Sequence, residues 1–71
     1  MVEQIEELFL TRKDGEIYRF AIDSTERILI EKALQRTLGN QISAAKILGL
    51  NRNTLRSKIR RLNINTGRFK Q

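Results

Sequence analysis

The feature that most constrains the fold is a pair of short helical patterns, residues 41–48 and 52–62, separated by only three residues. In the second pattern, Leu55, Ile59 and Leu62 recur at the spacing that places them on one narrow stripe of a helix. The other residues of this pattern are polar or basic. The spacing therefore predicts a helix that is anchored along one edge and offers its opposite face to a polyanion.

The first pattern is predicted to support the second. Asn40 is a suitable N-cap, and Ile42, Ala45 and Leu48 recur at every third position, which predicts one buried face. The small side chain of Ala45, with that of Ala44, lets two helices joined by a short turn cross closely. We therefore expect the two helices to pack against each other.

The connection between the two patterns has the composition of a tight turn. Gly49 stands where the residue after a helix needs a positive φ, Leu50 is predicted to fill the crevice between the helices, and Asn51 is predicted to cap the second helix. A helix, a glycine-containing turn and a basic second helix together form a helix-turn-helix. The second helix of this motif enters the major groove of DNA.

The 24 residues from Gly39 to Leu62, GNQxxAAxxLGxNRxTLRxKxxxL, resemble the Fis-type helix-turn-helix. This motif is found in the nucleoid protein Fis and at the C-terminus of NtrC-like sigma-54 enhancer-binding activators, and the preceding stretch looks more like the activators. The resemblance implies a homodimer that binds DNA, with contacts at Asn51 and Arg52. Ser57 departs from the family, which often has Lys there.

Residues 8–22 are predicted to form a β-hairpin. Residues that favour strands flank Asp14–Gly15, which is a strong hairpin signal, and a two-residue turn places Phe9 opposite Phe20. Because an isolated hairpin is only marginally stable in water, we expect it to pack on the helices or on a partner chain.

Residues 23–38 are predicted to form the core helix. Asp23 with Glu26 resembles a capping box, and Gly39 takes the C′ position. The apolar face covers about half of the circumference, more than the helix-turn-helix can bury. A dimer interface is therefore predicted, with a single core completed by the hairpin as the alternative. The residues assigned to the dimer interface are Ile28, Leu29, Ile30, Ala33, Leu34 and Thr37.

Charge is divided unevenly along the chain. Residues 1–38 hold six Lys/Arg and all eight Asp/Glu, whereas residues 39–71 hold eight Lys/Arg and no acidic residue. This asymmetry indicates a nucleic-acid-binding surface in the second half. The alternative is a solvated basic face, but solvated faces usually mix both signs of charge.

Composition excludes several classes of protein. The chain has no Cys and no His, so disulfides, thiolate chemistry, the usual zinc sites and the common nucleophile–base pairs are ruled out. We therefore expect no enzyme activity, no cofactor, no metal and no small-molecule substrate. No apolar run approaches the roughly 18 residues of a membrane span, and the acidic N-terminus is unlike a secretory signal. A cytoplasmic, nucleoid-associated bacterial protein is expected.

In the major groove, the first turns of the second helix reach base edges. Arg52 can donate two hydrogen bonds to guanine, and Asn53 can do the same for adenine. The predicted base-reading residues are Asn51, Arg52, Asn53 and Arg56. The predicted phosphate and groove contacts are Asn40, Gln41, Thr54, Ser57, Lys58, Arg60 and Arg61. Alternatively, Asn40 and Asn51 are plain helix caps, and Arg61 is merely solvated.

These patterns predict one mainly α domain over residues 1–71: a three-helix core with an N-terminal hairpin, and a tail over residues 63–71. In the tail, Ile64 is expected to cover the core, and the disordered basic end to touch phosphates.

The predicted function is binding of an inverted repeat in double-stranded DNA by a homodimer. The resemblance implies that binding tethers a sigma-54-dependent activator to its enhancer. One alternative is a stand-alone Fis-like nucleoid protein that bends DNA, and another is an RNA- or membrane-surface-binding module. The basic helix has no aromatic residue on which RNA bases would stack, and its narrow apolar stripe is needed for the core. Both features favour duplex DNA.

Overall fold

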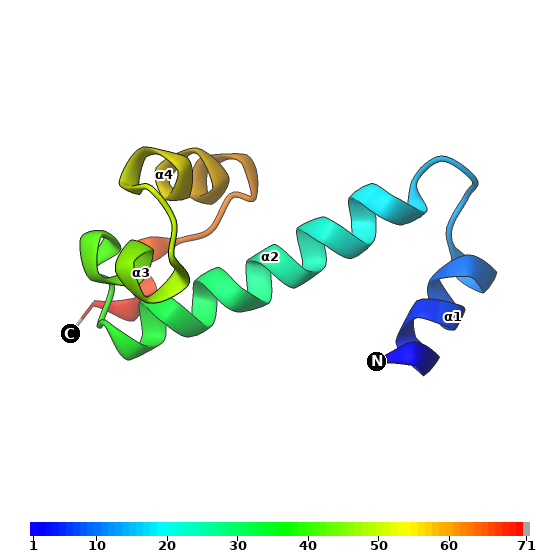
Figure 1. Ribbon diagram of the computed structural model, residues 1–71, viewed down its shortest axis with the longest axis horizontal. Helices are drawn as coiled ribbons and strands as arrows, with labels where there is room; N and C mark the ends of the chain where they lie inside the picture. The colour runs from blue at the N-terminus through cyan, green and yellow to red at the C-terminus, as the bar shows by residue number, and fades with distance from the viewer. Residues whose placement is uncertain (71) are drawn as a thin grey trace.

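The computed structural model describes residues 1–70, and Gln71, the last residue of the predicted tail, lies outside them. The described chain contains no strand. Its elements are α1 (Val2–Thr11), α2 (Ile17–Arg36), α3 (Gln41–Leu48), α4 (Arg52–Arg61) and a short 3-10 helix, η1 (Thr66–Phe69). Helices α3 and α4 pack at the C-terminal half of α2, whereas α1 lies beyond its other end (Figure 1). The mainly α prediction is confirmed.

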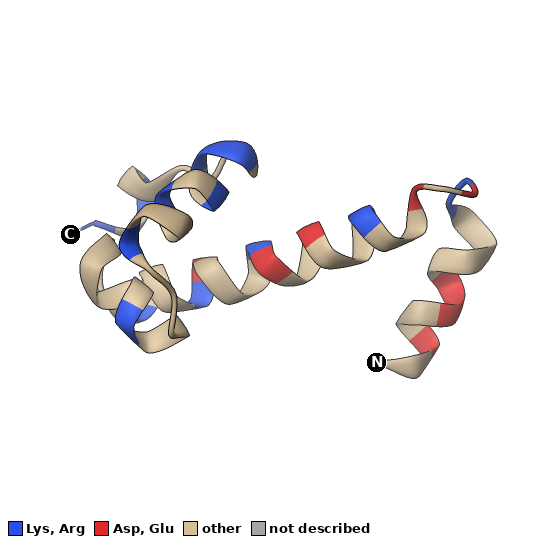
Figure 2. Cartoon of the chain, turned by 45° about the horizontal axis from the view of Figure 1, so that its top comes forward, with Lys and Arg blue, Asp and Glu red and all other residues tan. Residues whose placement is uncertain are grey.

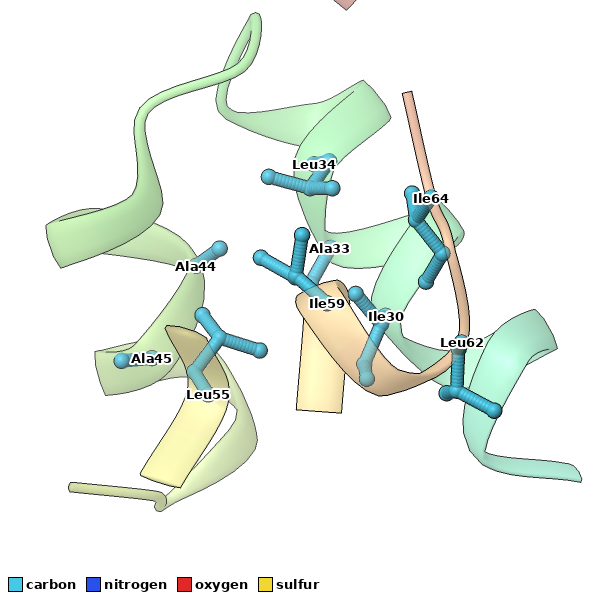
Figure 3. Packing of buried hydrophobic residues seen from close by; sticks show 9 residues of the cluster. All are labelled: Ile30, Ala33, Leu34, Ala44, Ala45, Leu55, Ile59, Leu62 and Ile64. Atoms are coloured by element: carbon cyan, nitrogen blue, oxygen red, sulfur yellow. The ribbon is translucent and has the colours of Figure 1, made fainter. Parts of the chain in front are cut away.

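The core lies between α2, α3, α4 and the segment after α4. Its buried side chains point toward one another in Figure 3. They are Ile30, Ala33 and Leu34 of α2, Ala44 and Ala45 of α3, Leu55 and Ile59 of α4, and the following Leu62 and Ile64. The three-helix core and the apolar stripe of α4 are therefore as predicted.

Alanines form the buried face of α3, as the small side chains suggested. Ala44 and Ala45 are 0% and 3% exposed, so the backbone of α3 comes close to its neighbours. The prediction that Ile42 shares this face is wrong, because Ile42 is 50% exposed. A face made of Ala44, Ala45 and Leu48 permits the close crossing, whereas the larger Ile42 lies outside it.

Helices α3 and α4 end in the same way. Gly49 has a φ of 73°, and the N–H of Leu50 donates to the carbonyl of Ala45 at 2.9 Å. Asn63 has a φ of 57°, and the N–H of Ile64 donates to the carbonyl of Ile59 at 3.0 Å. These left-handed endings turn the chain back on itself and bring Leu50 and Ile64 against the core.

The end of α2 is displaced by one residue from its predicted position. Leu38 and Gly39 both have a positive φ, of 55° and 85°, so the left-handed backbone after the cap residue Thr37 begins one residue before Gly39. The N–H of Gly39 then donates to the carbonyl of Leu34 at 2.8 Å. This hydrogen bond closes the helix and is made by the second residue after the cap, which is Gly39. Leu38 is therefore the first residue after the cap, and it adopts a conformation that is rare for a residue with a branched side chain.

The hairpin predicted over residues 8–22 is wrong. Asp14–Gly15 lies in the turn that joins α1, which ends at Thr11, to α2, which begins at Ile17, and the N–H of Glu16 donates to the carbonyl of Lys13 at 3.1 Å. Ile17 and Phe20 recur at helical spacing, and α2 carries that pattern through to the core. Since no further strand is available to form a sheet, continuation of α2 over 20 residues is the more stable outcome.

The capping box predicted at Asp23 and Glu26 is also wrong. Helix α2 begins six residues earlier, after Glu16, which makes no side-chain capping bond. Asp23 and Glu26 therefore lie inside the helix with their backbone N–H groups already bonded. Their carboxylates are left to bind groups on another element, and the structure places them against α4.

The tail contains the short helix η1, where the sequence pattern predicted a disordered basic end. Ile64 is 7% exposed, as expected, and the Asn65 side chain accepts a hydrogen bond from the N–H of Gly67 at 3.0 Å at the start of η1. Phe69 packs against the core. This contact holds η1 against α2, and the sequence pattern did not predict it.

Candidate nucleic-acid interface

Helices α3 and α4 form a helix-turn-helix with both N-termini capped. The Asn40 side chain accepts a hydrogen bond from the N–H of Ser43 at 3.1 Å, and the Asn51 side chain accepts one from the N–H of Asn53 at 2.8 Å. Leu50 lies between the helices, half-buried against the core. The caps and the turn thus fix where α4 begins and which of its faces is exposed.

The outer face of α4 is polar and basic. Leu55 and Ile59 are buried, so a rotation of about 100° per residue places Asn53 and Ser57 on the opposite side. Arg52, Arg56 and Arg60, spaced four apart, form a row along one flank. None of these three arginines makes an ion pair with any residue from Met1 to Lys70. We call these exposed residues the outer face: Arg52, Asn53, Arg56, Ser57 and Arg60.

Two residues of the arginine row, Arg52 and Arg56, face the beginning of α3 across an open groove. Asn40, Gln41 and Ile42 line one side of this groove, and Arg52 and Arg56 line the other. The first N–H groups of α3 carry partial positive charge, so both sides of the groove favour an anion. The structure therefore brings the predicted contacts of α3 and α4 together.

The opposite flank of α4 is tied to α2. Arg61 donates to Oδ1 of Asp23 at 2.7 Å and to Oε1 of Glu26 at 2.8 Å, and Lys58 forms an ion pair with Glu26. The hydrogen bond to Asp23 is the main cause of a raised pKa of Arg61. The sequence predicts phosphate contacts for Lys58 and Arg61, but the structure directs both toward carboxylates. Thr54, on the same flank, remains exposed.

Arg27 is a structural residue that the sequence pattern did not explain. It lies on the core-facing side of α2 and donates a hydrogen bond to the carbonyl of Leu62, directly after α4, and it lies 4.0 Å from Glu31. A cation on a carbonyl at a helix C-terminus is favourable.

The predicted dimer residues separate into two groups. Ile30, Ala33 and Leu34 are buried in the core of the chain itself, and the Thr37 hydroxyl donates to a backbone carbonyl of α2. Ile28 and Leu29 are exposed on α2. Further exposed apolar residues of α1 and α2 are Val2, Ile5, Phe9, Leu10, Tyr18 and Ile22.

Acidic residues are confined to one part of the molecule, whereas basic residues are not. Figure 2 shows the acidic residues on α1, on α2 and in the turn between them, whereas basic residues occur along α2 and in that turn and also over α4 and the C-terminal segment, where no acidic residue lies. Within residues 1–70, no group of three or more His, Cys, Asp or Glu residues is arranged to hold a metal ion. No helix of this part is long and apolar enough to cross a membrane.

The capping hydrogen bond of Asn51 is expected to contribute to the stability of the fold, which can be measured without DNA. Asn51→Ala is expected to lower the free energy of unfolding by about 1 kcal/mol, because the N–H of Asn53 loses its acceptor. Asn51→Ser keeps a capping oxygen and is expected to cost less than about 0.5 kcal/mol. Urea denaturation followed by circular dichroism measures both. Equal losses for the two variants would contradict the capping role.

Comparisons with known proteins agree on the helix-turn-helix part. Residues 21–62 match the family described as bacterial regulatory protein, Fis family. The chain is 48% identical over 64 residues to the DNA-binding transcriptional regulator NtrC of Azospirillum brasilense. The matched region covers 84% of this chain and 13% of the relative. The protein of the same description from Rhizobium meliloti (strain 1021) is 52% identical over 52 residues, 73% of this chain and 11% of the relative.

A third relative of that description, from Bradyrhizobium sp. (strain RP501 Parasponia), is 54% identical over 48 residues, 68% of this chain and 10% of the relative. The chain thus spans between 10% and 13% of the length of these three relatives. No solved structure gives a significant match.

Proposed function

The chain belongs to the Fis family of bacterial regulatory proteins, and from that premise we propose that it binds double-stranded DNA by placing α4 in the major groove. The observation that carries the proposal is the outer face of α4. Its three arginines have no carboxylate partner in the described chain, and two of them, Arg52 and Arg56, line an open groove together with the N-terminus of α3. An unpaired cationic row beside helix N–H groups suits a phosphate backbone.

Base reading is assigned to the beginning of α4. Arg52 is its first residue, where a positive charge is mildly unfavourable for the helix itself, so a role outside the helix accounts for it best. Its guanidinium suits guanine O6 and N7, and the Asn53 amide suits adenine N6 and N7. Asn51, whose Oδ1 caps the helix, still has its amide N–H groups to donate. Arg56, one turn further along, completes the set.

Phosphate positioning is assigned to exposed residues on both helices. Asn40 and Gln41 contribute from the beginning of α3, on the groove shared with the arginine row. Thr54, Ser57 and Arg60 contribute from α4. Lys58 and Arg61 are left out of this set because α2 already supplies their acceptors.

We further propose that two copies associate through α1 and the exposed part of α2. Tyr18, Ile22, Thr25 and Leu29 follow one another at spacings of four, three and four, which forms a continuous stripe of the kind that pairs helices. The three large apolar residues of this stripe are 79%, 40% and 52% exposed. Helix α1 has no buried residue of its own, so a second copy would supply the cover that it lacks.

The function of a longer protein is part of the same proposal. The relatives that the chain matches are described as DNA-binding transcriptional regulators, and each is several times longer than the matched region. We infer that this domain holds a transcriptional activator at its enhancer. In such a protein this domain would recognise the binding site on DNA, and other parts of the longer protein would activate transcription.

Selection of binding sites from a random duplex pool tests the proposal. The selected sites are expected to be inverted repeats with half-sites about 34 Å apart, one helical turn, because a two-fold dimer presents two copies of α4. Sedimentation equilibrium of the free protein is expected to give the mass of two chains. A monomer that selects no symmetric sequence would contradict the dimeric arrangement, and the absence of any selection would contradict DNA reading.

A further inference from the structure

We propose that Asp23 and Glu26 hold Lys58 and Arg61 away from phosphates and so limit the sequence-independent affinity of the domain for DNA. The inference rests on the proposed function and assigns a role to the flank of α4 that does not face the groove. It makes the two acids positioning residues, which act on DNA binding through the cations that they hold.

The contacts that carry the inference form one connected cluster. Arg61 spans the two carboxylates, with Nη1 2.7 Å from Oδ1 of Asp23 and Nη2 2.8 Å from Oε1 of Glu26. Lys58 occupies the other oxygen of Glu26, Oε2. Each cationic group of this flank therefore already has an anionic partner in the same chain, in the place that a phosphate oxygen would otherwise take.

The cluster divides the five cations of α4 by flank. Arg52, Arg56 and Arg60 form the unpaired row, whereas Lys58 and Arg61 lie on the side that faces α2. All eight acidic residues of the chain lie before Gly39, and of these only Asp23 and Glu26 pair with α4 within the described chain. The two acids thus neutralise Lys58 and Arg61 and make no ion pair with the proposed base-reading residues at the beginning of α4.

Exposure makes the cluster open to competition. The paired side chains are 28% exposed for Lys58, 42% for Arg61, 31% for Asp23 and 21% for Glu26. Ion pairs of this kind contribute little to stability, so removing the carboxylates is expected to free the cations without unfolding the chain. Both freed side chains are long and flexible enough to reach a neighbouring phosphate.

The consequence follows from counterion release. The logarithm of the binding constant for duplex DNA falls with the logarithm of salt concentration, with a slope of about −0.9 for each phosphate neutralised. Two withheld cations therefore make the slope shallower by up to about 1.8, and they lower affinity for DNA of any sequence. At 0.1 M salt, each released cation is expected to tighten binding about 8-fold if its contact is purely electrostatic.

The test measures binding of a random-sequence duplex over a range of salt concentrations, using the full chain. The variant Asp23→Asn/Glu26→Gln is expected to show a slope steeper than the wild type by about 0.9 to 1.8. The control Glu7→Gln/Glu16→Gln changes net charge equally, but neither residue makes an ion pair within residues 1–70, so its slope is expected to stay near that of the wild type. An unchanged slope for the first variant, or an equal change in the control, overturns the inference.

A second pair of variants keeps the inference testable if the acid substitutions disturb folding. Lys58→Ala/Arg61→Ala in the wild-type background is expected to leave the slope unchanged, because these cations are already engaged. The same change added to Asp23→Asn/Glu26→Gln is expected to remove the gain in slope. A shallower slope for Lys58→Ala/Arg61→Ala alone means that these residues already contact phosphates and overturns the inference. A wild-type chain that binds no duplex overturns the proposed function itself.

Discussion

Leu55→Ala is expected to lower the free energy of unfolding by about 2 to 5 kcal/mol, the range for truncating a fully buried leucine. Leu55 is 0% exposed and lies between the alanines of α3 and the apolar face of α2, so its removal leaves a cavity where three helices meet. A domain of this size has a total stability of roughly 4 to 10 kcal/mol, so the variant is expected to lose a large part of its folded population on mild heating. Thermal and urea denaturation followed by circular dichroism provide the measurement.

Ile47→Ala is the matched control for this loss. Ile47 is also a large aliphatic residue of the helix-turn-helix, but it is 57% exposed. Its truncation is expected to change stability by less than about 0.5 kcal/mol. Comparable losses for Leu55→Ala and Ile47→Ala would show that the core is not arranged around α4 as described.

Arg52→Ala is expected to weaken binding to the selected DNA site by about 1 to 3 kcal/mol, or roughly 5- to 150-fold, and to relax the base preference at one position of each half-site. The expected reason is loss of the bidentate contact to guanine that we propose for Arg52, while the fold is expected to be retained because Arg52 is exposed. Titration of the selected duplex and of a random duplex, in the same salt, gives the two affinities.

The control for Arg52 is Arg19→Ala, another exposed arginine, near the beginning of α2 and away from the arginine row. It is expected to leave the preference among DNA sequences unchanged. If Arg52→Ala lowers the affinity for the selected and the random duplex equally, Arg52 does not read a base and contacts only phosphate.

The helix-turn-helix could be predicted closely because its signals are local. Asn40 and Asn51 mark helix starts, Gly49 marks a helix end, and the spacing of Leu55 and Ile59 defines a buried stripe. Each signal acts within one or two turns of the chain, where spacing and side-chain chemistry determine the structure. The exposed face of α4 follows once the stripe is placed.

The N-terminal third was mispredicted because its local signals are compatible with two structures. Asp14–Gly15 closes a hairpin or joins two helices, and the choice depends on what the flanking residues can pack against. In the structure, the guanidinium of Arg12 lies 3.7 Å from the ring centre of Phe20, a contact across the turn that accompanies two helices. The sequence pattern gave no means of ranking that packing against a strand pair.

The ion pairs on the far flank of α4 depend on contacts between distant residues. Asp23 and Arg61 are 38 positions apart, so neither can be assigned a partner from spacing along one helix. The misplaced start of α2 added to the difficulty, because it made the same two acids look like a cap. Knowing that α2 begins at Ile17 would have placed Asp23 and Glu26 within the helix, where their carboxylates are free to pair with another helix.

Interference by dimethyl sulfate methylation tests whether α4 reads the major groove. Methylation of guanine N7 modifies the major groove, and methylation of adenine N3 modifies the minor groove of the same duplex. If α4 reads the major groove, N7 methylation within each half-site is expected to block binding, whereas N3 methylation is not. Binding that tolerates N7 methylation throughout the site and is lost on N3 methylation would contradict major-groove reading by α4.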